Sequence, residues 1–142
     1  MKRRSERGSA AVEAVVGLPA FALFVVLIVL GGRTATAHQA LESAAADAAR
    51  SASLARTGTA ADEAARTAAQ TSLDNQHLDC RSIDVSVDSE AFALPLGREG
   101  SVEVTVACRL ELSDLSIPGL PGSRLLRSSM SSPLDSWRER TP

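Results

Sequence analysis

The apolar positions of this chain follow three successive patterns, and the first is a continuous run. Residues 10–30 are apolar apart from one acid, Glu13. A run of this length suits a helix that crosses roughly 30 Å of hydrocarbon in a bilayer. We therefore expect a transmembrane helix over residues 9–32, preceded by a basic leader at residues 1–8. A carboxylate inside such a helix costs on the order of 2.5–3.5 kcal/mol, which makes Glu13 the main candidate for a functional residue.

The two halves of the expected membrane helix differ in side-chain size. The first half is rich in small residues, which let helix backbones approach closely inside a membrane. The second half is bulky, which suits contact with lipid or with large side chains. Pro19 removes one backbone donor, so we expect it to kink the helix or to unwind it near residue 15.

The second pattern has a helical period. Small apolar residues recur at spacings of three and four within residues 40–52, and again within residues 61–73. This recurrence predicts helices over about 33–57 and 60–73, with a break at Gly58. The apolar stripe of the first helix fits two interpretations equally well: a surface for a partner helix, or a face that covers a sheet of the same chain.

The third pattern alternates between apolar and polar residues. It predicts strands over about 82–88 and 101–112, which pair as an antiparallel hairpin across a loop rich in Pro and Gly. A weaker strand is expected over about 123–132. Cys80 is out of phase with the strand that follows it, so we expect it just before that strand or beside a bulge.

Charges around the apolar run indicate its orientation. Arg33 alone follows the run closely, whereas four basic residues precede it: Lys2, Arg3, Arg4 and Arg7. This bias predicts a single-pass protein of the cell membrane, in contact with the lipid bilayer, with its N-terminus in the cytoplasm and residues 33–142 outside. The net charge of −2 argues against a general nucleic-acid binder, so we expect no nucleic-acid partner.

The two cysteines lie in the part that we expect to be exported. An oxidising compartment favours a disulfide between Cys80 and Cys108. It closes a loop of about 29 residues, worth roughly 3 kcal/mol in the chain-entropy model. The expected fold class is therefore α+β: an N-terminal transmembrane helix extended by an exported helix, then a small antiparallel β-sheet closed by one disulfide.

Motifs for catalysis are missing from the sequence. It has no nucleophile elbow, no zinc-binding H-E-x-x-H pair and no phosphate-cradling glycine loop, so we expect neither an enzyme nor a cofactor. His77 and Cys80 form an H-x-x-C pair that suggests a metal site. Two ligands and a distant Cys108 make a poor tetrahedral set, so we favour the disulfide and expect no metal.

The start of the chain resembles a class III (type IV) prepilin signal. The resemblance rests on a basic leader followed by Gly8-Ser9-Ala10-Ala11-Val12-Glu13 and an apolar helix. It implies that a membrane-embedded prepilin peptidase cuts between Gly8 and Ser9 on the cytoplasmic face. It also implies that Glu13 then pairs with the new amine of a neighbouring subunit, which offsets the burial of its charge.

A wider pattern resembles the TadE-like proteins, small pilin-like components of tight-adherence (Tad/Flp) pilus machinery. It includes Leu18-Pro19 within the span, the cysteine pair, Leu120-Pro121-Gly122 and an ending over residues 132–138. The resemblance implies a minor pilin or pseudopilin that supports pilus biogenesis, and so adhesion or secretion. Its implied partners are the prepilin peptidase, other pilins or pseudopilins along the N-terminal helix, and the inner-membrane assembly platform.

Two other functions stay open at this point. One is a signal-anchored accessory or binding domain that is exported and unrelated to pili. The other is a soluble secreted protein, released by cleavage after Ala37 in an A-x-A site at residues 35–37. The apolar stretch exceeds the 7–15 residues usual in a secretory signal, which weighs against this second alternative.

Overall fold

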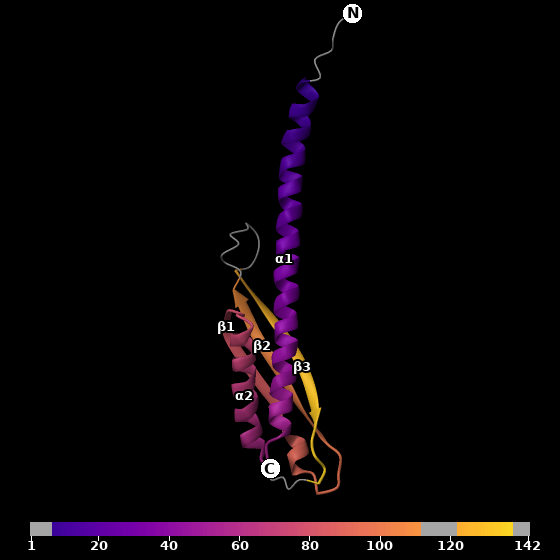
Figure 1. The fold of residues 1–142 in the computed structure, drawn as a ribbon, viewed down its shortest axis with the longest axis vertical. Coiled ribbons are helices and arrows are strands. Elements are labelled where there is room, and N and C mark those ends of the chain that lie inside the picture. The colour runs from indigo at the N-terminus through magenta and orange to yellow at the C-terminus, as the bar shows by residue number, and fades with distance from the viewer. Residues whose placement is uncertain (1–6, 112–121, 138–142) are drawn as a thin grey trace, which may run out of the picture. The chain divides into compact units, whose positions relative to one another are not determined.

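A computed structural model of the chain describes residues 7–111 and 122–137, with side chains from Glu13 onward. The chain divides into two compact units, Met1–Thr36 and Ala37–Pro142. We call them the N-terminal and the C-terminal unit and describe each by itself. Helix α1 (Arg7–Ser53) begins in the first and ends in the second (Figure 1).

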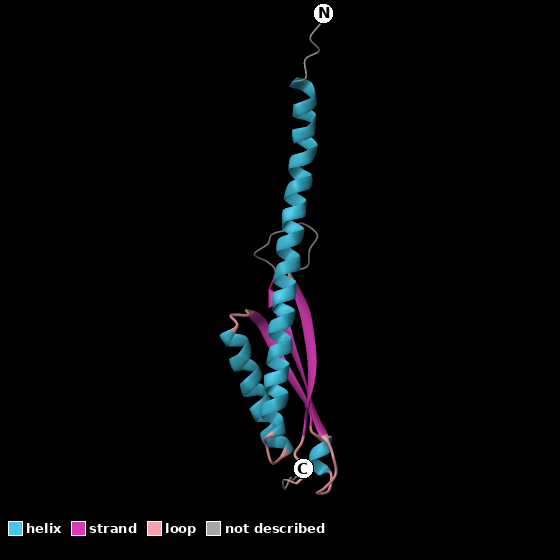
Figure 2. Ribbon diagram, turned by 45° about the vertical axis from the view of Figure 1, so that its right-hand side comes forward, coloured by secondary structure: helices cyan, strands magenta, loops and turns pink. Residues whose placement is uncertain are grey.

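The C-terminal unit is a two-layer α+β fold, as predicted. A three-stranded antiparallel sheet has the order β1-β2-β3, and the end of α1 and the whole of α2 cover one of its faces (Figure 2). After α1, the elements are α2 (Gly58–Asn75), β1 (Cys80–Asp88), the 3-10 helix η1 (Glu90–Ala93), β2 (Ser101–Glu111) and β3 (Ser123–Pro133). The hairpin of β1 and β2 and the third strand are confirmed.

Alanine fills much of the layer between helices and sheet. Within the C-terminal unit, α1 buries the positions of the predicted stripe, including Leu41, Ala44 and Ala48, all at 0% exposure. The stripe is therefore a face that covers the sheet of the same chain, which decides between the two interpretations of residues 40–52. Small side chains allow helix and sheet to approach closely, and β2 contributes the valines opposite them, Val102, Val104 and Val106.

The boundary between the two helices differs from the prediction. α1 ends at Ser53 rather than near residue 57, and α2 begins at Gly58 rather than near 60. Thr57 is the N-cap, and its side chain accepts a hydrogen bond from the Ala60 amide at 3.1 Å. Gly58 has a packing reason, because a Cβ there would lie 3.2 Å from the Ser89 hydroxyl.

The register of β1 explains the phase of Cys80. Pairing is regular from Ser82 to Asp88, and it shifts between Cys80 and Ser82, so Arg81 is the extra residue of a bulge. Cys80 consequently pairs with Leu110 and shares a face with Cys108. The expectation that Cys80 lies beside a bulge is confirmed.

Two features of the core differ from the sequence pattern. Phe92 lies on η1 within the segment expected to be a loop, yet it is only 1% exposed. In β3, Leu126 is the buried residue, whereas Leu125 and Met130 are 43% and 37% exposed. The expected Leu120-Pro121-Gly122 turn lies largely outside the described residues.

Candidate membrane-helix site

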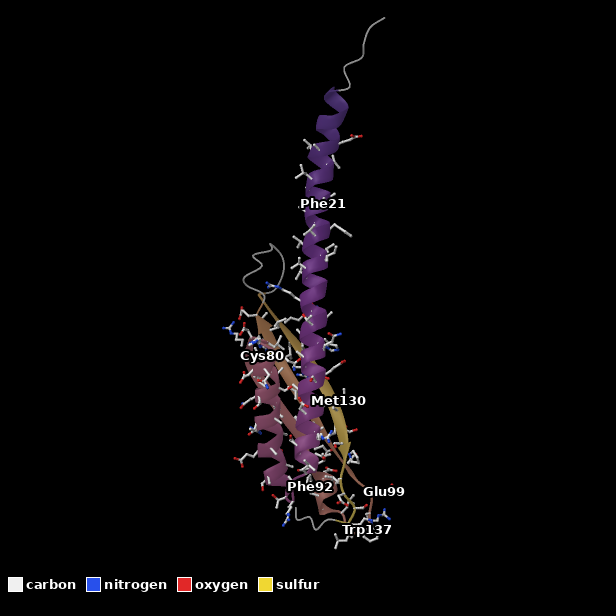
Figure 3. All side chains as sticks on the ribbon, viewed as in Figure 1. Phe21, Cys80, Phe92, Glu99, Met130 and Trp137 are labelled. Atoms are coloured by element: carbon white, nitrogen blue, oxygen red, sulfur yellow. A yellow bond between two sulfur atoms is a disulfide. The ribbon has the colours of Figure 1, made fainter. Side chains whose placement is uncertain are left out.

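The first part of α1 carries a continuous apolar surface. Most of its large side chains are exposed, from 37% at Val26 to 74% at Val15, and Phe21 is 68% exposed. Figure 3 shows side chains along both sides of this part of the helix. Within the described residues, this is the helix long and apolar enough to cross a membrane. Soluble monomers rarely expose so much contiguous apolar surface, which supports the predicted span.

Glu13 lies at the beginning of this surface and is itself exposed. Gly17 and Ala20 follow it by four and seven residues, and Phe24 follows by eleven. Residues at these spacings share one face of a helix. The one acid of the apolar run therefore shares its face with small side chains in the first half of the span.

The glycines of the span have no packing role within the described chain. A Cβ built on Gly17, Gly31 or Gly32 meets no atom within 4 Å. Glycine also lowers helix stability by about 1 kcal/mol relative to alanine in water. Contacts within the described chain therefore do not explain why residue 17 is a glycine. Close packing against a second helix in the membrane would explain it.

The predicted processing site lies at the very start of the helix. α1 begins at Arg7, so the Gly8–Ser9 peptide bond is in its first turn, while the side chains of residues 7–12 are not described. The first turn of a helix lacks acceptors for its amide groups and opens at the least cost. A protease that binds extended backbone has therefore only this turn to unwind.

Pro19 lies inside α1, and the helix is continuous on both sides of it. The local unwinding expected near residue 15 does not occur in this structure. The alternative, a bend at Pro19, stays a prediction.

The residues after the apolar run keep their hydroxyl groups satisfied within the helix. Thr34 donates to the Leu30 carbonyl at 2.8 Å, and Thr36 donates to the Gly32 carbonyl at 3.0 Å. Such bonds to the preceding turn let hydroxyl residues sit at the edge of an apolar segment without an unpaired donor.

The cysteine pair forms the predicted disulfide. Cys80 and Cys108 are joined with a Cα–Cα distance of 5.5 Å, between neighbouring strands. Because its sulfur is bonded to Cys108, Cys80 offers no thiolate to a metal. The H-x-x-C interpretation of His77 and Cys80 is therefore wrong, and the described residues contain no group of three or more potential metal ligands.

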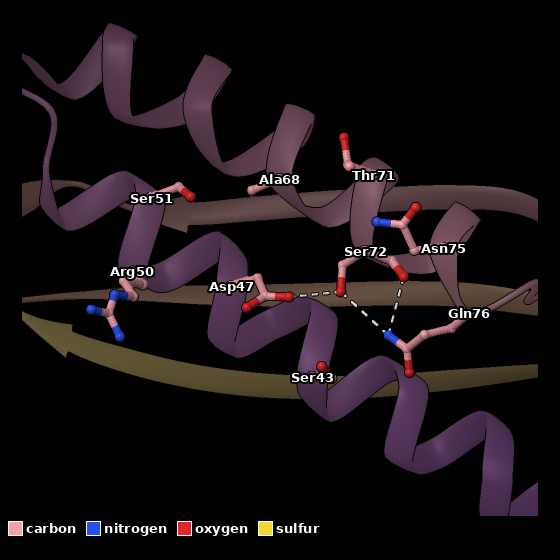
Figure 4. A pocket seen from close by; sticks show the side chains of 9 residues that line it. All are labelled: Ser43, Asp47, Arg50, Ser51, Ala68, Thr71, Ser72, Asn75 and Gln76. Atoms are coloured by element: carbon pink, nitrogen blue, oxygen red, sulfur yellow. Dashed lines mark hydrogen bonds between the residues drawn. The ribbon is translucent and has the colours of Figure 1, made fainter.

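A polar cluster that the sequence analysis missed joins α1 to α2 (Figure 4). Ser72, only 8% exposed, donates to Asp47 Oδ2 at 2.7 Å. Gln76 Nε2 donates to the Ser72 carbonyl at 3.1 Å and lies 3.4 Å from the Ala40 carbonyl. A hollow of about 530 Å³ lies beside the cluster. Asp47, Ser72 and Gln76 are hydrogen-bonded to one another or to the backbone of the other helix, so this cluster holds α2 against α1. Asp47 and Ser72 are 25 residues apart, and no local pattern signals their contact.

Comparison with known proteins gives one family. Residues 8–50 match the family model described as TadE-like protein, which confirms the resemblance seen in the sequence. The matched region contains Gly8, Glu13, Pro19 and the buried stripe of α1. No curated protein and no solved structure gives a significant match to the chain.

Proposed function

We propose that this TadE-like chain is a minor pilin or pseudopilin of a Tad (Flp) type IV pilus assembly system. It is anchored by the span within α1 and supports pilus biogenesis, and so adhesion or secretion. It acts as a structural subunit and not as an enzyme. Its N-terminus lies in the cytoplasm and its C-terminal unit lies outside, in accordance with the charge bias around the span.

The observation that carries the proposal is the acid on the small-residue face of an otherwise apolar helix. An ionised carboxylate in hydrocarbon needs a partner of opposite charge. The described residues provide no salt bridge to Glu13. A second helix that packs against Gly17 can place a positively charged group beside the Glu13 carboxylate.

Cleavage between Gly8 and Ser9 supplies the positive partner. The cut by a prepilin peptidase creates a charged amine at Ser9, the first residue of the mature chain. Glu13 is then the fifth residue of that chain. The amine of one pilin then pairs with Glu13 of its neighbour. A paired charge tolerates burial, whereas breaking such a pair by removing one partner is strongly destabilising, by about 3–5 kcal/mol.

The mature N-terminus tests processing directly. Mass spectrometry of the chain purified from its own cells should find a chain that begins at Ser9. Gly8→Leu should keep Met1, because a bulky side chain blocks close approach of the protease to the backbone. An intact N-terminus in the unaltered chain, in cells with an active prepilin peptidase, contradicts the proposal and supports the signal-anchored accessory domain.

Assembly tests the role of Glu13. Glu13→Leu should leave membrane insertion intact, because the span becomes more apolar, and it should abolish co-purification with partner pilins. Glu13→Asp keeps the charge and serves as the matched control, which should retain part of the binding. If Glu13→Leu assembles as well as the unaltered chain does, charge pairing is not the role of this residue.

The structure also bears on the secreted alternative. Cleavage after Ala37 would cut the chain inside α1. It would also remove Ala37 from the hydrophobic core of the C-terminal unit, where this residue is 2% exposed. A chain that begins at His38 in mass spectrometry is the result that supports this alternative.

A further inference from the structure

The face of the sheet turned away from the helices has a polar surface with a distinct order of charges. Its residues alternate with the buried ones along each strand and are mostly exposed. Register pairing aligns three of its rows: Ser82–Arg109–Leu125, Asp84–Ala107–Arg127 and Ser86–Thr105–Ser129. We call this surface the outer sheet face.

One end of the outer sheet face is basic. Arg109 on β2 and Arg127 on β3 lie at adjacent rows there. Glu111 is on the same side of β2, but Arg81 lies 3.7 Å from its carboxylate and forms a salt bridge with it. Asp84 on β1 shares the row of Arg127 and carries one negative charge. The two arginines outnumber it, so this end keeps a net excess of positive charge.

The opposite end is acidic. Asp88 pairs directly with Glu103 across β1 and β2, so two carboxylates share one row. Like charges at opposed positions destabilise a sheet. Within the described part of the chain, neither carboxylate takes part in a salt bridge. Asp88 Oδ1 accepts a hydrogen bond from the Glu90 amide at 3.1 Å, which gives this side chain a local role in the turn before η1. That bond does not offset the repulsion between the two carboxylates, whereas a cationic partner offsets it.

Along β2, small side chains separate Arg109 from Glu103 on this face. Ala107 is 7% exposed, and it lies in a shallow hollow of about 470 Å³ between the flanking strands. Thr105 and Ser129 share a hydrogen bond of 2.7 Å across β2 and β3. Side chains this short let another surface approach the backbone of the sheet closely.

We propose that the outer sheet face binds a second copy of this chain, with Arg109 and Arg127 of one copy opposite Asp88 and Glu103 of the other. The surface carries both charge signs at separate ends, so two copies are complementary when unlike ends meet. Like ends repel one another when they are placed together, which disfavours that arrangement. This contact belongs to the C-terminal unit and does not rest on the role of Glu13.

An exchange of charges between two variants tests the proposal. The first variant carries Asp88→Lys with Glu103→Lys, and the second carries Arg109→Glu with Arg127→Glu. The full chain is prepared in mild detergent with two different tags, and binding between tags is measured at low salt. Each variant should bind itself at least about tenfold more weakly than the unaltered chain binds itself, and the two variants mixed should recover the binding.

The control is an equal change of charge elsewhere on the C-terminal unit. Glu63 and Asp74 are exposed on α2, so Glu63→Lys with Asp74→Lys should leave binding unchanged. All combinations contain the same α1, so association through the span cancels in the comparison. Circular dichroism establishes that each variant is folded. Equal binding in every combination overturns the proposal, and so does a failure of the mixed variants to recover binding while both are folded.

Discussion

At the scale of single residues, the packing of the core in the C-terminal unit depends on the small volume of its alanine side chains. Ala48 is fully buried, whereas Ala46, two positions earlier on α1, is exposed. Ala48→Leu should therefore destabilise the unit by about 1–3 kcal/mol through overpacking. Ala46→Leu makes the same chemical change on the outer side and should stay within about 0.5 kcal/mol. Urea unfolding of the full chain in detergent, followed by circular dichroism, measures both, and equal losses would show that the helix does not pack on the sheet as described.

Phe92 is the residue that sequence patterns could not place. It has neither a helical nor an alternating apolar neighbourhood, because η1 is one short turn inside a loop. Its burial to 1% exposure makes it one of the largest core side chains. Phe92→Ala should lower the free energy of unfolding by about 3–5 kcal/mol. Leu96→Ala, at a position 60% exposed in the same loop, should change it little; a small loss for Phe92→Ala would mean that the loop does not dock on the core.

At the scale of elements, the periodicity of apolar residues predicted the helices and strands, but it did not predict the tertiary contacts between them. The alternation of β1 and β2 fixed their inward faces, and the phase of Cys80 even indicated the bulge at Arg81. In β3 the inward row contains serines, so the alternation was too weak to distinguish Leu126 from Leu125. The contact between α1 and α2 through Asp47 and Ser72 is a tertiary hydrogen bond, which no local pattern encodes.

The contribution of the Asp47–Ser72 hydrogen bond to the packing of α2 on α1 can be measured. Ser72→Ala removes the 2.7 Å hydrogen bond to Asp47 and one partner of Gln76. Asp47 is exposed enough to regain water, so the loss should be about 1 kcal/mol. Thr71→Ala is the control, because its hydroxyl bonds only within α2, to the Thr67 carbonyl at 2.9 Å. Hydrogen exchange should then quicken for α2 amides in Ser72→Ala more than in the control, and identical exchange in the two variants would mean that the cluster does not hold α2.

At the scale of the whole molecule, the sequence predicted more about the N-terminal unit than the structure can add. The predictions for this unit depend on local sequence features that can be recognised without tertiary contacts. These features are the apolar run at residues 10–30, Glu13 within it and the basic leader before it. The partner of Glu13 is a different matter, because it lies on another chain in our proposal. No property of one chain identifies that partner, and for this reason the assembly experiments concern pairs of molecules.

The disulfide provides a reporter for the orientation of the whole molecule. Our orientation places Cys80 and Cys108 in an oxidising compartment, where their disulfide forms and persists. Replacing the four leader bases Lys2, Arg3, Arg4 and Arg7 by Glu, together with Gly31→Arg and Gly32→Arg, reverses the charge bias that sets the orientation. The C-terminal unit should then stay in the cytoplasm, and both cysteines should react with a thiol reagent after lysis. Gly31→Gln with Gly32→Gln keeps the bias and should leave the thiols protected. Protected thiols in the reversed chain, or reactive thiols in the unaltered one, contradict the orientation that we propose.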